Sequence, residues 1–221
     1  MILRLFCLSL MVIAIAGCSA TKDAPKYELI DGEYHYRQPG EKFRPIFAYV
    51  DGDSVSLFVD EEGTKPIVPQ VLRDEIFLRR SLDVDILTMP FKGRGGQANL
   101  PRQLTADFNG NIFLGYRFDR FRFIHKRSPV GWRRFYKHRA LSAGAFGGLG
   151  TAAITPWTTN YRINEEYTGF VLSQGVAVMA GVSNLTVGVG LGWDHLTDRD
   201  RDIWIYQHKP WYGVTIGLNL N

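Results

Sequence analysis

The stretch from Arg117 to Arg139 is the part of the chain best suited to binding a charged ligand. It holds nine lysines and arginines and one acid, with aromatic residues interleaved. Such a surface binds single-stranded nucleic acid in cytosolic proteins, whereas in a secreted protein the available phosphates belong to lipid headgroups or lipopolysaccharide. The same composition is typical of a rim at a membrane interface. The residues assigned to lipid or lipopolysaccharide binding are Arg120, Arg122, Lys126, Arg127, Trp132, Arg133, Arg134 and Lys137.

A second set of charges alternates with apolar residues along two predicted strands. Its members are Asp83, Asp85, Arg117 and Asp119. Alternate strand residues face opposite sides of a sheet, so these four share the face opposite their apolar neighbours. Small barrels fill their interiors with side chains, often paired charges. We expect a structural ion network here, and a proton or solute path is the alternative.

Catalysis and metal binding find little support in the sequence. The five histidines have no metal-ligand spacing. His195, at a predicted strand end, is the one candidate for catalysis by a lipid A-modifying barrel. The acids of Asp198–Asp202 resemble the opening of a calcium loop but lack its sixth-position glycine and closing glutamate. We predict no catalytic residue, no metal and no cofactor.

The segment from Gly169 to Asp194 shows which elements would position these groups. From Leu185 to Trp193 every second residue is apolar, and the residues between are threonine or glycine. This alternation predicts a strand with one apolar face. A looser alternation precedes it, and only Ser183-Asn184 separates the two, which is the length of a hairpin turn. We expect a membrane hairpin with its apolar face to lipid and its small residues to the lumen.

Similar patterns predict further membrane strands. Together they lie near 82–91, 102–124, 139–154, 166–182, 185–195 and 210–221. The smallest single-chain barrels have eight strands. The runs 46–50 and 54–59 would supply the missing two strands. Alternatively, splitting 102–124 at Asn109-Gly110 would give one more strand, and the N-terminal half would supply the other. The alternation changes phase at Asp119-Arg120, which predicts a β-bulge.

The sequence therefore predicts an all-β fold, a small closed antiparallel transmembrane β-barrel of about eight strands with a packed lumen. We assign residues 81–221 to the barrel and 46–80 to a short hairpin region. A hydrophobic fraction of 45 % and 23 glycines fit strands that meet lipid on one face only. The net charge of +4 is too small to imply a polyanionic partner. If both chain ends lie in the periplasm, the tight turn at Ser183-Asn184 lies there too. Counting strands back from the C-terminus then places the cationic stretch on the periplasmic side.

The first eighteen residues have the pattern of a secretory signal. One arginine precedes an apolar run from Leu5 to Ala16, which is too short for a spanning helix. Ile15-Ala16-Gly17-Cys18 resembles the lipobox of bacterial lipoproteins. The resemblance implies cleavage after residue 17, lipidation of Cys18 and, with Ser19 following, sorting to the outer membrane. Residues 1–17 are then a signal peptide and 18–45 a tether, and secretion excludes nucleic acid as a partner.

Two blocks, SLDVDILTMPFK at 81–92 and IWIYQHKPWYGVTIGLNLN at 203–221, resemble passages in uncharacterised outer-membrane proteins of Gram-negative bacteria. The resemblance implies a barrel in the outer membrane and assigns no functional residue. We predict an envelope lipoprotein with a structural or binding role. The alternatives are a narrow solute channel, a lipid A- or phospholipid-modifying enzyme, and a soluble periplasmic β-domain on a lipid anchor. Expected partners are outer-membrane lipids including lipopolysaccharide, the barrel assembly machinery and the lipoprotein sorting machinery.

Overall fold

The computed structural model describes residues 28–51, 54–59, 73–97, 100–129, 131–182 and 185–219. Within these ranges the chain is all-β and antiparallel, apart from the single 3-10 turn η2 (Trp157–Thr159). No helix in the described part has the length and hydropathy needed to cross a membrane. The predicted signal peptide, Cys18 and the turn at Ser183-Asn184 lie outside the described residues.

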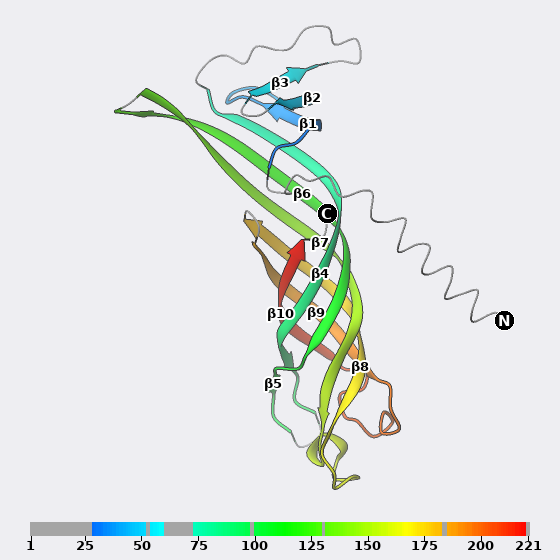
Figure 1. Cartoon of the computed structure of the whole chain (residues 1–221). Coiled ribbons are helices and arrows are strands. Elements are labelled where there is room, and N and C mark those ends of the chain that lie inside the picture. The colour runs from blue at the N-terminus through cyan, green and yellow to red at the C-terminus, as the bar shows by residue number, and fades with distance from the viewer. Residues whose placement is uncertain are drawn as a thin grey trace, which may run out of the picture.

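Ten strands make up the sheet. Their bounds are β1 (Gly32–Arg37), β2 (Arg44–Asp51), β3 (Ser54–Phe58), β4 (Glu75–Arg94), β5 (Gln103–Thr105), β6 (Asn109–Ser128), β7 (Gly131–Ile154), β8 (Tyr167–Val182), β9 (Leu185–Leu196) and β10 (Pro210–Asn219). Neighbours in the sheet follow the order β10-β9-β8-β7-β6-β4-β1-β2-β3. Since β10 also pairs with β4, the six strands β4 and β6–β10 close into a ring (Figure 1).

The ring has six strands in the described chain, where the sequence predicted eight. The β2–β3 hairpin does not enter the ring, because it pairs with β1, and β1 pairs with β4 only at Ile76–Leu78. That pairing lies beyond the part of β4 that β10 occupies. The predicted strand 102–124 is interrupted instead at residues 106–108, and β5 adds only three residues against β4.

The two ends of the ring differ. One end carries β1–β3, the end of β10 and the paired strand ends Ser128↔Gly131 and Val182↔Leu185, and we call it the sheet end (Figure 1). The opposite end carries the longer connections that follow β4, β7 and β9, and we call it the loop end (Figure 1). Close turns therefore gather at one end and long loops at the other.

The outer face of the ring is apolar and exposed. Leu82, Leu114, Phe170 and Val189 keep 74, 61, 70 and 65 % of their surface accessible. No Asp, Glu, Lys or Arg is exposed in the described strand segments 82–91, 110–118, 141–153, 168–180, 187–193 and 212–216. We call the outward side chains of these segments the apolar belt.

The interior of the ring is filled. A cluster of buried apolar side chains packs across its middle, namely Leu87, Met89, Phe113, Phe146, Ala177, Met179 and Trp211. Glycines on the same face make room for them. A Cβ at Gly192 would lie 2.7 Å from Trp211 Cζ2, and one at Gly175 would lie 2.7 Å from Phe146 Cζ. A narrow ring leaves no space for a side chain at every inward position.

The predicted β-bulge at Asp119-Arg120 is wrong. The β4–β6 and β6–β7 registers run through this point without a shift. Phe121 lies on the same inward face as Arg117. The inward side chains change from ionic at Arg117 to aromatic at Phe121, and this change of residue type imitates a change of phase. The aromatic part lies under β1, where the Tyr34 and Phe121 ring centroids are 6.0 Å apart. A register shift occurs in β10 instead, between Val214 and Ile216.

Candidate functional site: a cationic hairpin and two buried ionic clusters

β6 and β7 continue beyond the ring at the sheet end as a two-stranded hairpin. Pairing runs from Asp119↔Ala140 to Ser128↔Gly131. Figure 1 shows this hairpin leaning away from the ring beside β1–β3. We call it the cationic hairpin. The sequence-predicted lipid-binding residues all belong to it.

The register sorts these residues onto two faces, because directly opposed residues in an antiparallel pair lie on the same side of the sheet. The outward face continues the outer surface of the ring. Its cross-strand pairs are Arg120↔Arg139, Arg122↔Lys137, Ile124↔Phe135 and Lys126↔Arg133. All six cations are exposed. Five of them were predicted; Arg139 was missed, although its alternation with Lys137 could have revealed it.

The inward face holds the remaining predicted residues, Arg127, Trp132 and Arg134. It is largely aromatic and packs toward β1. The Phe121 ring stacks on His138 at 4.8 Å between centroids, and the Arg134 guanidinium carbon lies 3.8 Å from the Phe123 ring centre. Arg134 also lies 3.5 Å from Glu75 Oε2. The inward face therefore holds Arg134 against Phe123 and Glu75, whereas Arg127 and Trp132 near the tip are exposed.

One carboxylate offsets part of the positive charge of the outward face. Within the described residues, Asp74 Oδ2 accepts a hydrogen bond from Arg122 Nη2 at 2.8 Å, and no other outward cation has a salt bridge. Lys126 Nζ lies 5.9 Å from the Phe135 ring centre. This face therefore keeps a strong positive field.

The predicted lumen charges are buried at the sheet end of the ring, and the structure brings three of them together. Arg117 Nε donates to Asp119 Oδ1 at 2.9 Å, and its Nη1 lies 3.8 Å from Asp83 Oδ1. His138 Nε2 is 2.7 Å from the same Asp119 oxygen. Asp85 is fully buried on the same face of β4. We call this group the Arg117 cluster.

Ser142, whose Oγ donates to Asp83 Oδ2, joins the Arg117 cluster from β7. Sequence reasoning missed Ser142, because glycine and alanine obscure the alternation of that part of the strand, and it missed His138, which lies in the cationic stretch.

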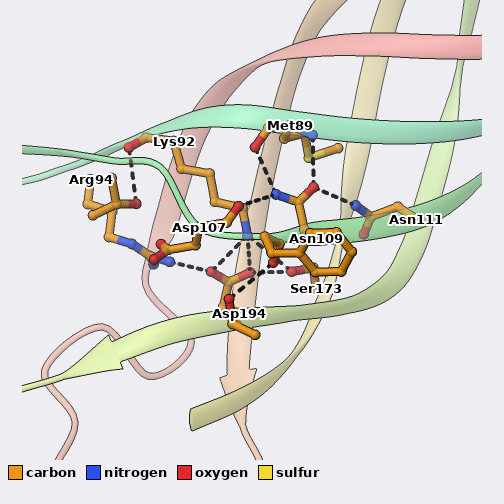
Figure 2. A network of polar contacts seen from close by, with 11 residues as sticks. Met89, Lys92, Arg94, Asp107, Asn109, Asn111, Ser173 and Asp194 are labelled. Carbon is orange, nitrogen blue, oxygen red and sulfur yellow. Dashed lines mark hydrogen bonds and ion pairs between the residues drawn. The ribbon is translucent and has the colours of Figure 1, made fainter. Parts of the chain in front are cut away.

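A second buried ionic cluster, which we did not predict, lies nearer the loop end (Figure 2). Asp194 accepts bonds from Lys92 Nζ at 3.2 Å, from Arg94 Nη2 at 2.5 Å and from Ser173 Oγ at 2.6 Å. Lys92 also lies 4.6 Å from the Trp211 ring centre. We call this group the Asp194 cluster. Asp194 belongs to the inward parity of its strand, which was the available signal.

Asn109 supports the Asp194 cluster from β6. Its side-chain Oδ1 accepts the Met89 N–H at 2.8 Å, and its Nδ2 donates to the Met89 carbonyl oxygen at 2.8 Å (Figure 2). Asn111 donates to Asn109 Oδ1 at 3.2 Å. These bonds hold β4 and β6 together where β6 begins.

The serines of the two clusters have different partners: in the Asp194 cluster Ser173 Oγ accepts from Lys92 Nζ at 3.2 Å and donates to Asp194. In the Arg117 cluster Ser142 bonds to a carboxylate, and the buried His138 contacts Asp119, so the serine–histidine hydrogen bond of a nucleophilic site is not formed. His195 Nδ1 lies 3.3 Å from His208 Nε2 and 2.8 Å from the Gln207 amide. His195 therefore contacts residues of the loop that precedes β10. Ser142 and His138 contact the buried carboxylates of the Arg117 cluster.

The acidic segment Asp198–Asp202 is used by its own loop. Asp198 accepts the N–H of Asp200 at 3.0 Å, and Asp200 accepts the hydroxyl of Tyr167 at 2.7 Å. Within the part of the chain that the structure describes, no three His, Cys, Asp or Glu side chains are grouped to hold a metal ion.

A groove of about 930 Å³ lies where β1–β3 meet the start of β4. Its lining includes Glu33, His35, Phe47, Phe58 and Arg80. The Arg80 guanidinium carbon also lies 5.7 Å from the ring centre of Phe118, in the apolar belt. The groove therefore borders the belt at the sheet end.

Comparison with protein-family models, with curated proteins and with solved structures found no match to this chain. Function has to be argued from the belt, the hairpin and the two clusters themselves.

Proposed function

We propose that the six-stranded ring is a closed β-barrel inserted in the outer membrane, and that the protein is a lipid-anchored envelope protein with a structural or binding role. The apolar belt carries this proposal. Soluble proteins rarely expose an apolar patch larger than a few hundred Å², and here every ring strand contributes exposed apolar side chains. The segment of β4 between Leu82 and Phe91 matches the roughly 9–11 residues of a membrane strand.

The hydrogen bonding of the ring supports insertion. Lipid cannot satisfy free backbone groups, so a membrane sheet must have no open edge. Pairing of β10 with β4 from Trp211↔Arg94 to Asn219↔Asp85 removes the edge that a flat sheet would leave. The charges lie inside, where Asp194 and Arg117 have partners, and none lies in the belt.

The orientation follows from the two ends. Outer-membrane barrels have short turns in the periplasm and longer loops outside. By this rule the sheet end faces the periplasm, which is where a lipid on Cys18 would hold the N-terminus. The cationic hairpin then lies on the periplasmic side.

A solute channel is the second candidate, and the packing speaks against it. Phe113, Phe146 and Trp211 lie in the middle of the ring with 0, 5 and 1 % of their surface exposed. An open pore needs a water-filled lumen, which larger barrels have and small ones fill with side chains. Purified protein in planar bilayers should show no stepwise conductance, and regular single-channel steps would favour the channel.

Heat-modifiable migration tests the central proposal. Detergent-extracted protein is run on SDS gels with and without boiling. An inserted closed barrel resists SDS until it is heated, so the unboiled band should migrate faster than the boiled one. A soluble β-domain on a lipid anchor would give one band under both conditions and would also be released from membranes once the lipid is removed. That pair of results would overturn the proposal.

A further inference from the structure

We infer that the outward face of the cationic hairpin binds the phosphate headgroups of anionic phospholipids in the leaflet at the sheet end. The inference rests on the proposed membrane insertion and adds a ligand class and a leaflet to it. It names one occupant for a face that the described residues leave exposed.

Cross-strand charge pairing is the first argument. Like charges directly opposite each other in a sheet are destabilising. The hairpin places Arg120 opposite Arg139, Arg122 opposite Lys137 and Lys126 opposite Arg133 on one face. Asp74 offsets one member of these pairs. A face built this way is stabilised by an anionic surface, because each lysine or arginine near such a surface gains on the order of 1 kcal/mol.

The position of the face relative to the belt is the second argument. Phe118 pairs with Leu141 at the edge of the belt, and the next outward pair is Arg120↔Arg139. Two residues of strand advance about 7 Å, so these arginines lie where hydrocarbon gives way to headgroups. Ile124 and Phe135 interrupt the cations farther out, a combination of apolar and basic groups that suits a membrane interface.

The lean of the hairpin is the third argument. Its inward side packs toward β1, with Phe121 and Phe123 in the same core as Tyr34. The outward side is therefore the one left to face the leaflet. Lys126 is about 20 Å along the strand from Arg120, farther than the headgroup layer is deep. Figure 1 shows the hairpin leaning away from the ring, and we infer that this lean brings the outer cations to the phosphates.

The phosphates are assigned to phospholipid and not to lipopolysaccharide. Lipopolysaccharide occupies the outer leaflet, which by the turn asymmetry meets the loop end. The cationic hairpin lies at the opposite end, beside β1–β3 (Figure 1).

The test measures lipid selectivity of the full mature chain. Protein is reconstituted in vesicles of phosphatidylcholine with a minor fraction of phosphatidylglycerol, extracted gently, and its retained lipids are counted by native mass spectrometry. The wild type should retain phosphatidylglycerol in excess of its bulk fraction. Arg120→Gln with Arg139→Gln should lower this enrichment by about fivefold for each cation removed.

The matched control removes two exposed cations at the loop end, Arg102→Gln with Arg162→Gln, and should keep the enrichment. Heat-modifiable migration of each variant reports folding separately. Folded, heat-modifiable protein without lipid preference, or equal loss in both variants, would overturn the inference while leaving membrane insertion intact. Protein that never becomes heat-modifiable would instead overturn the proposed function.

Sidedness has its own experiment. Ser128→Cys places a thiol at the exposed hairpin tip, and an impermeant maleimide is applied to intact cells. The thiol should react only after the outer membrane is permeabilised. Labelling of intact cells would place the hairpin outside and overturn the assignment to phospholipid.

Discussion

Glycines lie beside large aromatic side chains in the ring interior, and one added methyl group at such a glycine would overlap the neighbouring ring. Gly192 is the clearest example, because its backbone passes directly against the Trp211 indole. Gly147 has the same residue type on the outer surface, where a Cβ would meet only Ser173 O at 3.9 Å. The two positions make a matched pair for measuring interior packing.

Gly192→Ala should lower the free energy of unfolding by about 1–3 kcal/mol, the usual cost of overpacking. The new Cβ would lie 2.7 Å from the Gln174 carbonyl oxygen as well as from Trp211, so backbone must move. Gly147→Ala should change it little. Guanidinium unfolding in detergent micelles, followed by tryptophan fluorescence, gives both values. Equal effects at the two sites would contradict the filled interior.

Asp194 is the one carboxylate hydrogen-bonded to Lys92 and Arg94 in the described cluster. Asp194→Asn leaves both cations buried without a counter-charge, and breaking a buried pair costs roughly 3–5 kcal/mol. In a Lys92→Met background the same substitution should cost less, because one stranded charge is already gone. A double-mutant cycle of unfolding free energies measures the difference. Additive costs would show that the cluster does not act as a unit.

At the scale of elements, alternation predicted the outward faces of β8, β9 and β10 and of parts of β4 and β6, and it predicted the β8–β9 hairpin. It did not predict the faces of β7 or the pairing of strands distant in sequence. Residues 82–91 and 139–154 were found as strands, yet β4 and β7 extend to Glu75 and Gly131. Period-two patterning is lost there because both faces become polar or aromatic. Lys92 and Asp194 lie 102 residues apart, and no local pattern carries a contact of that range.

The small sheet β1–β3 docks on the ring through tyrosines that should respond to alkaline pH. The Tyr36 hydroxyl donates to Glu75 Oε1 at 3.2 Å, and burial, reinforced by this carboxylate, raises the pKa of Tyr36 well above its usual value of 10.0. A raised pKa in the folded state favours the protonated form. Its stabilising contribution is therefore complete below pH 10 and falls as the pH rises beyond it.

Tyr36→Phe should accordingly flatten the loss of stability above pH 10. Thermal unfolding followed by near-ultraviolet circular dichroism at pH 8 to 11.5 compares the variant with the wild type. Tyr49→Phe, at an exposed position of β2, is the control and should leave the wild-type slope unchanged. Identical slopes for Tyr36→Phe and the wild type would show that this hydroxyl is not a determinant of docking.

For the molecule as a whole, the belt divides the surface into a charge-free zone and charged ends. Val189 is exposed in the belt, and Tyr49 is exposed on the small sheet. In water an arginine at either place would change stability little, usually within about 0.5 kcal/mol. In a lipid bilayer an arginine at position 189 should lower stability, whereas an arginine at position 49 should not.

Val189→Arg should cost about 2–4 kcal/mol in phospholipid vesicles, the range for arginine near the bilayer midplane, and Tyr49→Arg should be near neutral. Reversible guanidinium unfolding in vesicles supplies both numbers. A neutral Val189→Arg would mean that the belt does not meet hydrocarbon, and the membrane proposal would fall with it.

The pairing of β4 with β10 also affects the order in which the ring can fold. It joins the first strand of the ring to the last, and Trp211 pairs with Arg94, which lies about half the chain length away in sequence. Contacts so distant in sequence form slowly, and β4 leaves the ribosome well before β10. Until the last strand arrives, two strand edges are open to any passing chain. A chaperone that shields those edges before closure is therefore a requirement that this topology places on the cell.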